Sequence, residues 1–480
     1  MKKIKFALIS VMLLSSMTIF AQQSNTMYYM DRVMQAQTIN ISQSPAHKVQ
    51  VGGLIIPVFG QFLPSMYLNY GNNAFNYNHL IHFGEGAYKD SLVFDMPLFR
   101  KKIRKNNNIT TELHLDYLDV SVKSKNDAVI SVTLGDRLLL GTSLPRDLFE
   151  LVINGNYDYM QQNETHDLSN LSLDMTYFHE LGIGFSSNIG ERFNIGASMK
   201  LLFGVANIST KVASLGLETD PENYFITATA NMQLRTAGDL CSFVTEGDST
   251  HLEANLSPSF LKSFSNMGLA VDLGFAYNIT EKIGISFSAC DFGFINWSRN
   301  AQVASAKGDY TFEGVNVSLM QDEEGNTALG IDGNGYNVSN LVDTALNAFH
   351  MRVVDKNYTT WLPSNVYVGA TYQLHPKIGF GFLYHGEIYK KSFMQQFTLS
   401  ANSNLTHWLS LHASWSLINN TVGNLGFGFS IRGAIFTWYA VTDNVLSMIW
   451  PQKAKTMNIR MGCNLTFGHP KKVSKVANKL

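Results

Sequence analysis

Long runs of alternating side chains recur along this sequence. In the run MGLAVDLGFAY at residues 267–277, every second residue is large and apolar, and small or charged residues such as Asp272 stand between them. Successive side chains of a β-strand point to opposite faces, so this run predicts a strand with one apolar face and one small, polar face. Similar runs begin at Tyr177, Phe193, Val366, Ile378, Leu409, Leu425 and Met457.

The length of these runs distinguishes a soluble sheet from a membrane wall. Most runs span about seven to thirteen residues, whereas strands of soluble proteins cluster near five or six. A tilted strand needs roughly nine to eleven residues to cross a bilayer. An open sheet edge in hydrocarbon would leave backbone groups unpaired, so such strands have to close on themselves. The pattern therefore predicts an all-β protein, a transmembrane antiparallel β-barrel.

Residues 1–21 have the features of an export signal. Three lysines at positions 2, 3 and 5 precede an almost uncharged apolar run that ends at Phe20, and the small residue Ala21 follows. The run is too short for a membrane-spanning helix and is typical of a cleaved secretory signal peptide. Because no cysteine follows the run, we expect no lipid anchor at the mature N-terminus. The chain is predicted to be exported.

Composition narrows the class of exported protein. Aromatic residues make up 12% of the chain and charged residues only 15%, against about 25% charged residues in soluble domains. With 36 basic and 37 acidic residues, the formal net charge is -1, which argues against a nucleic-acid partner. The three cysteines are too few and too scattered for a disulfide framework, and no motif indicates a metal or another cofactor. We expect a barrel in the outer membrane of a Gram-negative cell, without cofactors.

The connections between the runs indicate two different ends of the barrel. Short links at 278–282, 375–377 and 405–407 are typical of periplasmic turns. The intervals 206–265 and 296–362 are longer and richer in polar residues, and we expect them to be extracellular loops. Apolar residues at helical spacing predict short helices within loops at 145–152 and 338–349.

The last alternating run resembles the C-terminal signal by which outer-membrane barrels are recognised by the barrel-assembly machinery. Phe467 closes the run NIRMGCNLTF with an aromatic residue. The resemblance implies that Phe467 acts in assembly, with the assembly machinery and outer-membrane lipids as partners. The basic segment 469–480 follows and is expected to be a periplasmic tail.

The start of the mature chain carries a second resemblance. Residues 28–35 read YYMDRVMQ, Asn40 and the pair Pro45-Ala46 follow, and residues 52–62 read GGLIIPVFGQF. These features resemble an uncharacterised family of outer-membrane barrels related to FadL-type fatty-acid transporters and to PorV-type barrels of type IX secretion. FadL-type barrels begin with a plug carrying Asn-Pro-Ala, which is divided here between Asn40 and Pro45-Ala46.

The resemblance implies a barrel of about 14 strands without catalytic residues. We therefore expect a plug-like segment at 22–60 and a barrel at 61–468.

Four charged residues fall on the expected inner face of the strands and are candidates for function: Lys200, Asp272, Arg432 and Arg460. Charged groups within a membrane protein often mark substrate paths, but they also pair across a lumen and stabilise it. The sequence leaves both interpretations open. Its histidines are not accompanied by a nucleophile motif, so we expect no enzyme.

Three functions compete on these grounds. The first is passage or binding of small apolar molecules through a plugged barrel. The second is a PorV-like scaffold that binds secreted or surface proteins at the outer membrane without transporting anything. The third is a soluble β-sandwich adhesin, which the strand length and the final run ending in Phe467 disfavour. We expect the first function, and the second is the alternative.

Overall fold

A computed structural model describes part of this chain. The described residues are 25–468 except 54–56, 59–60, 63–64, 85, 87–88, 90, 247–248, 255–263, 314–316, 322–326, 332–348, 350–351, 390–391 and 419–420. The predicted helix at 338–349 and the predicted tail at 469–480 lie almost wholly outside these residues. Among the described helices, none is both long enough and apolar enough to cross a membrane.

Within the described part of the chain, 14 antiparallel strands form a closed barrel. The alternation predicts such a barrel, and the family resemblance implies this number of strands. The last strand pairs with the first long strand and closes the ring. In chain order the wall strands are β4 Ser65–Asn72, β7 Asn106–Lys123, β8 Val129–Pro145, β10 Ser172–Ile189, β11 Phe193–Thr219, β15 Met267–Asn278, β16 Ile283–Trp297, β22 Ser364–His375, β23 Ile378–Tyr389, β24 Ser392–Ser403, β25 Leu409–Ile418, β26 Thr421–Gly433, β27 Phe436–Thr442 and β28 Thr456–Phe467.

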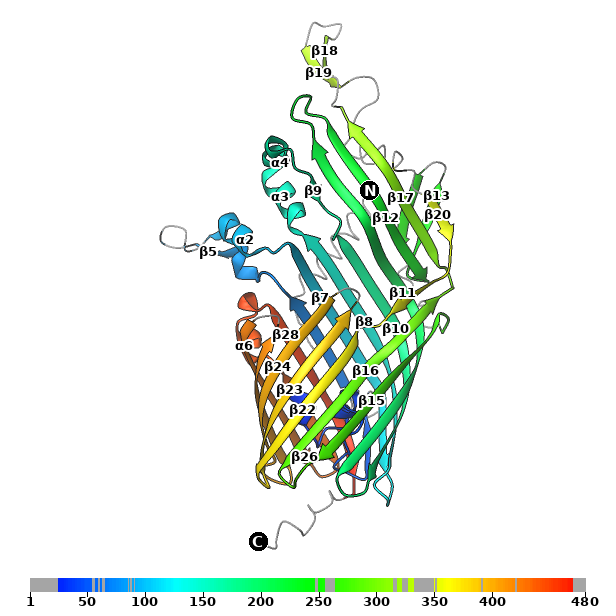
Figure 1. Cartoon of the computed structure of the whole chain (residues 1–480), viewed down its shortest axis with the longest axis vertical. Helices are drawn as coiled ribbons and strands as arrows, with labels where there is room; N and C mark the ends of the chain where they lie inside the picture. The colour runs from blue at the N-terminus through cyan, green and yellow to red at the C-terminus, as the bar shows by residue number, and fades with distance from the viewer. Residues whose placement is uncertain are drawn as a thin grey trace.

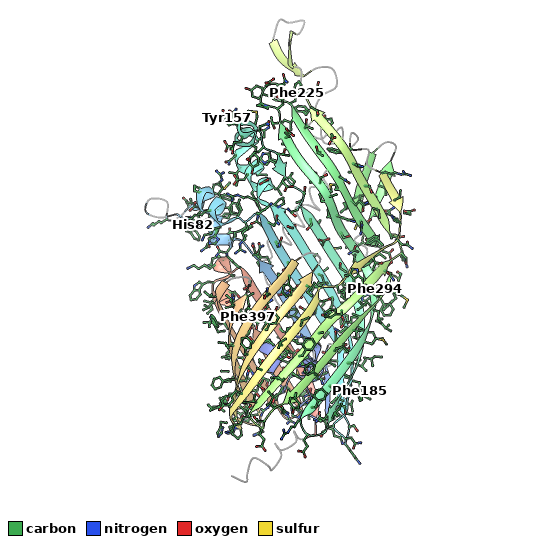
Figure 2. All side chains as sticks on the ribbon, viewed as in Figure 1. His82, Tyr157, Phe185, Phe225, Phe294 and Phe397 are labelled. Atoms are coloured by element: carbon green, nitrogen blue, oxygen red, sulfur yellow. The ribbon has the colours of Figure 1, made fainter. Side chains whose placement is uncertain are left out.

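The two faces of the wall follow the alternation in the sequence. In β15, Met267 and Leu273 are 61% and 53% exposed, whereas Asp272 is 3% exposed. Large apolar side chains cover the outer surface, and Phe185, Phe294 and Phe397 mark it at different heights (Figure 2). The outer face is therefore the apolar face that a bilayer requires.

The two ends of the barrel differ in their connections. At one end, which we call the turn end, short connections join β15 to β16, β22 to β23 and β24 to β25, as the sequence predicts. The last wall strand, β28, also ends there at Phe467. Long connections and most of the short helices lie at the opposite end, which we call the loop end.

The two intervals expected to be loops contain long strands, so this prediction is wrong in part. Strand β11 runs for 27 residues and continues above the ring, where β12 Ile226–Gly238 and β17 Gln302–Phe312 extend the sheet (Figure 1). The pairing of β11 with β12 shifts register between Val212 and Ser214. Such a bulge interrupts the period of two, so the alternation is hard to see in the sequence.

Short helices and strands accompany the strands of the wall. The predicted helix at 145–152 is confirmed as α3 Arg146–Asn154, and its Phe149 ring packs edge-on against Phe75 and Phe99. The other described helices and strands are η1 Asn25–Tyr29, η2 Met34–Thr38, η3 Tyr77–His79, α2 Met96–Lys102, α4 Tyr157–Gln162, α6 Val445–Ile449, η6 Pro451–Lys453, β1 Val49–Gly52, β2 Pro57–Val58, β3 Gln61–Phe62, β5 Ile81–Phe83, β6 Leu92–Phe94, β9 His166–Asp167, β13 Cys241–Glu246, β14 Ser249–Ala254, β18 Val317–Gln321, β19 Thr327–Ile331, β20 Arg352–Asp355 and β21 Tyr358–Trp361.

Candidate functional site: a plugged lumen

Residues 25–48, which we call the plug, pack against the inner face of the barrel. Within them, Met27, Tyr28 and Met30 are at most 1% exposed and form one apolar cluster with inner residues of the wall. The chain enters the wall at Val49, because β1 pairs with β28 on one side and with β7 on the other. The predicted plug-like segment at 22–60 thus contains both a lumen segment and a short piece of wall.

The small inner face of the strands makes room for the plug. A Cβ atom at Gly196 of β11 would lie 2.6 Å from the carbonyl oxygen of Ile41 in the plug. At Gly381 of β23 it would lie 2.5 Å from the ring of Tyr29. Both distances are shorter than real contacts of Cβ atoms. The glycines seen in the sequence therefore indicate a crowded lumen.

The first residues of the plug are fixed to the loop end by one carboxylate. Asp443 follows β27 and is 1% exposed. Its oxygens accept hydrogen bonds from the backbone N–H groups of Asn25 and Thr26, both at 2.8 Å, and from the Thr26 hydroxyl at 2.5 Å. The Asn458 side chain donates a further bond at 2.9 Å. Hydrogen bonds to a charged acceptor are each worth about 1.5–3 kcal/mol, so Asp443 is a strong anchor.

The second helix of the plug is held by polar side chains of the wall. Gln35 and Asn464 of β28 exchange two side-chain hydrogen bonds of 2.9 Å, and Gln35 also donates to Asp119 of β7 at 2.9 Å. Arg460 donates to the Thr38 hydroxyl at 3.1 Å. Arg460 is thus one of the groups that join plug and wall, a role that the sequence alone did not show.

Buried charges from five neighbouring strands form what we call the ion layer, which consists of Arg137, Glu180, Lys200, Asp272 and Asp291. Lys200 lies 2.8 Å from Asp272 and 2.6 Å from Asp291. Arg137 lies 2.9 Å from Glu180 and 3.1 Å from Asp291. Lys200 and Asp272 thus pair between the adjacent strands β11 and β15, which is one of the two interpretations that the sequence left open.

Asp291 connects the two halves of the ion layer. It has a φ of +62°, a conformation that is uncommon for residues other than glycine, and its N–H donates to Asp272 at 2.8 Å. The pairing of β15 with β16 shifts register between Val271 and Leu273 at the same place. Asp291 could not be identified from the sequence, because this bulge changes which residues of β16 face inward.

On the loop side of the ion layer, apolar side chains fill the lumen. We call this cluster the apolar layer, and its buried members are Phe178, Leu202, Ala237, Ala270, Ile295, Trp297, Ala301 and Leu362. Phe178, Leu202 and Ala270 each stand two residues from a member of the ion layer on the same strand. The indole N–H of Trp297 donates to the Thr360 hydroxyl at 2.8 Å. The apolar layer meets the buried charges directly.

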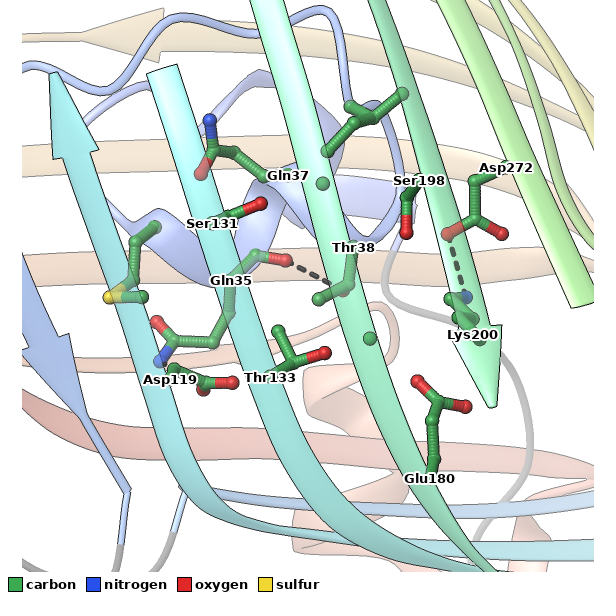
Figure 3. Close-up of a pocket in the computed structure, with 14 residues that line it drawn as sticks. Gln35, Gln37, Thr38, Asp119, Ser131, Thr133, Glu180, Ser198, Lys200 and Asp272 are labelled. Carbon is green, nitrogen blue, oxygen red and sulfur yellow. Dashed lines mark hydrogen bonds and ion pairs between the residues drawn. The ribbon is translucent and has the colours of Figure 1, made fainter. Parts of the chain in front are cut away.

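A small cavity remains between the plug and the wall. It has a volume of about 30 Å³, and its lining includes Gln35 and Thr38 of the plug and Asp119, Glu180 and Lys200 of the wall (Figure 3). A volume of this size holds on the order of one to three water molecules. The cavity is too small for an organic substrate.

The remaining predicted residues lie apart from this cavity. Arg432 lies at the turn end of β26, where its backbone N–H donates to the Trp408 carbonyl at 2.7 Å. Phe467 is the last residue of β28, is 42% exposed and pairs with Val49. Its role in assembly stays a prediction.

The first strand of the wall is divided. Gly52 at the end of β1 pairs with Asn464 of β28, and Met66 near the start of β4 pairs with Met461. Between these partners, β28 has only residues 462–463, whereas the first strand has residues 53–65. The described strands in this interval, β2 and β3, pair with each other and not with the wall.

Comparisons with known proteins give one matching family and several similar solved structures. A family profile described as "Family of unknown function (DUF5723)" matches residues 45–443. No curated protein matches the sequence. Solved structures similar to this chain include the toluene transporter TbuX of Ralstonia pickettii, with 7% identity, TM-score 0.40 and coverage of 91% of this chain and 94% of that one.

Two further solved structures are similar to this chain. A FadL homologue of Pseudomonas aeruginosa has 9% identity and TM-score 0.39, with 94% and 99% coverage of this chain and that one. The toluene transporter TodX of Pseudomonas putida has 9% identity and TM-score 0.37, with 93% and 97% coverage. FadL-type proteins, which the sequence resembles, are thus among the similar structures, and the profile match covers most of the chain. The chain belongs to the Family of unknown function (DUF5723).

Proposed function

We propose that the protein is an outer-membrane barrel of FadL-like type that takes up small apolar molecules at the loop end and releases them sideways into the membrane. The observation that carries this proposal is the order of apolar and charged side chains along the lumen. The apolar layer lies on the loop side, and the ion layer and the plug lie beneath it.

This order favours a sideways path. An apolar molecule gains from contact with the apolar layer but loses on entering a region of buried charges, because those charges need their partners. The first strand, which lies between β7 and β28, is divided into β1 and β4, so the wall is interrupted there. Both features support an exit through the wall and not along the lumen.

We also propose that the signal peptide is removed and that the barrel-assembly machinery inserts the mature chain into the outer membrane. The mature protein is then expected in the outer-membrane fraction, and it should migrate faster on a gel when it is not heated, because a closed barrel resists detergent. Release into the soluble periplasmic fraction would contradict this location.

The uptake proposal is tested by widening the apolar layer. Trp297→Ala removes the largest side chain of that layer, so we expect faster accumulation of a radiolabelled monoaromatic hydrocarbon or medium-chain fatty acid in cells. Trp438→Ala on the outer face is the matched control and should leave accumulation unchanged. Equal rates in all three proteins, and in cells without the protein, would rule out uptake of these compounds.

A scaffold that binds secreted or surface proteins is the second candidate. The extended sheet at the loop end favours it, because β11, β12 and β17 present surface well above the ring. An unchanged uptake rate together with loss of a surface protein on deletion of the gene would favour the scaffold.

A further inference from the structure

We propose that a monovalent metal cation of the sodium class binds in the cavity between the plug and the wall, against the carboxylate of Asp119. This site goes beyond the proposed passage of apolar molecules and does not depend on it. It rests on a charge excess, an unpartnered buried oxygen and the size of the cavity.

The lumen around the cavity contains more acids than bases among the described residues. The ion layer holds three carboxylates and two basic groups. Arg460 pairs with Asp116 at 3.2 Å, and Asp119, three residues further along β7, has no ion pair within the described part of the chain. Among these eight groups, the carboxylates outnumber the basic groups by two. Buried charge without a counter-charge is costly, so protons or a cation have to compensate it.

One buried oxygen atom shows where a positive charge is needed to balance the excess negative charge. Asp119 is 2% exposed, and its Oδ2 atom accepts a hydrogen bond from Gln35 at 2.9 Å. Its Oδ1 atom is buried and has no hydrogen-bond partner among the described residues. Buried polar atoms nearly always have a partner, and this one belongs to a residue that lines the cavity (Figure 3). The Oδ1 atom of Asp119 is therefore suited to binding a cation.

The donor set around the cavity favours a metal ion of low charge. Thr38, Ser131 and Thr133 line it together with Asp119, and hard cations prefer hydroxyl and carboxylate oxygens. Lys200 also lines the cavity, but its charge is paired with Asp272 and Asp291, and the Thr38 hydroxyl already accepts a hydrogen bond from Arg460. The described residues contain no group of three or more His, Cys, Asp or Glu side chains placed for a metal ion. One unpaired carboxylate with neutral oxygens therefore suits a monovalent ion better than a divalent one.

The volume of the cavity selects the size of the cation. A space of about 30 Å³ accommodates a small metal ion with a water molecule, but not an organic ammonium ion. Thr38 belongs to the plug, whereas Asp119, Ser131 and Thr133 belong to the wall. A cation in this place would join plug and wall and would stabilise the closed lumen.

The test measures whether sodium stabilises the folded protein. Full-length mature protein in lipid vesicles is unfolded with urea at fixed pH and ionic strength, while NaCl is replaced stepwise by N-methyl-D-glucamine chloride, whose cation is too large for the cavity. For one site, the folded-to-unfolded ratio should rise about tenfold for each tenfold increase in sodium above half-saturation. Equal ratios in the two salts would show that protons balance the charge and would overturn the proposal.

Variants locate the effect. Asp119→Asn replaces an unpaired charge with a neutral group of the same size, so we expect a folded barrel without the sodium dependence. Thr133→Val, which removes one lining hydroxyl, should shift half-saturation to higher sodium. The matched control is Thr398→Val in β24, which is also buried and bonds to Ser416. A full sodium response in Asp119→Asn, or equal losses in Thr133→Val and Thr398→Val, would contradict a site at Asp119.

Discussion

Deleting residues 22–48 is expected to convert a silent barrel into a conducting pore. The plug packs against the inner face of strands all around the ring, from Asp443 after β27 to Ser286 of β16. Without it, the small inner side chains of these strands would face a water-filled lumen. Purified protein in a planar bilayer should show little steady conductance when intact and stable steps after the deletion.

A point substitution separates loss of the plug from damage to the barrel. Asp443→Ala removes the acceptor for Asn25 and Thr26, so we expect intermittent openings between the silence of the intact protein and the steps of the deletion. The Thr398→Val protein should stay silent. Large stable conductance from the intact protein would make it a general porin, and silence from the deletion would show that the lumen is closed without the plug.

Two neighbouring residues of β15 should respond very differently to substitution. Val271 faces outward, so Val271→Arg places a charge on the lipid face and should cost about 2–4 kcal/mol if it lies near the bilayer midplane. Asp272 faces inward and is 3% exposed. Asp272→Asn should cost less, because Lys200 keeps Asp291 as a partner at 2.6 Å. Urea unfolding in lipid vesicles measures the loss of stability in both variants.

The control for this comparison is Val271→Leu, which keeps an apolar side chain outward and should unfold close to the unchanged protein. A greater loss of stability in Asp272→Asn than in Val271→Arg would mean that the outer face at this height does not contact lipid.

Much of the barrel could be predicted from local pattern. Alternation fixes the facing of strands such as β15 and β23, because adjacent side chains of an extended chain point in opposite directions whatever the neighbouring strand is. The short turn at 375–377 could also be predicted, because it depends only on the few residues that form it. The pattern missed the upper part of β11, where a bulge between Val212 and Ser214 interrupts the alternation, and it also missed β12 and β17.

The candidate site was less predictable. Lys200 and Asp272 stand on strands β11 and β15, and their pairing needs only that these strands be neighbours. Asp291 enters the ion layer through a bulge and a positive φ, and neither follows from residue order. Asp119 stands out because Gln35 donates to one of its oxygens, whereas the other has no partner in the described part of the chain.

The sequence by itself determined that this protein has long two-faced strands with an apolar outer side, because side-chain direction along a strand depends on residue order alone. It also determined that the inner side is small, through residues such as Gly196 and Gly381. Only the tertiary structure decided what fills that space. The plug meets these glycines across the lumen from positions more than 150 residues away in sequence. Contacts of that kind depend on ring closure and strand register, which no single segment of the chain contains.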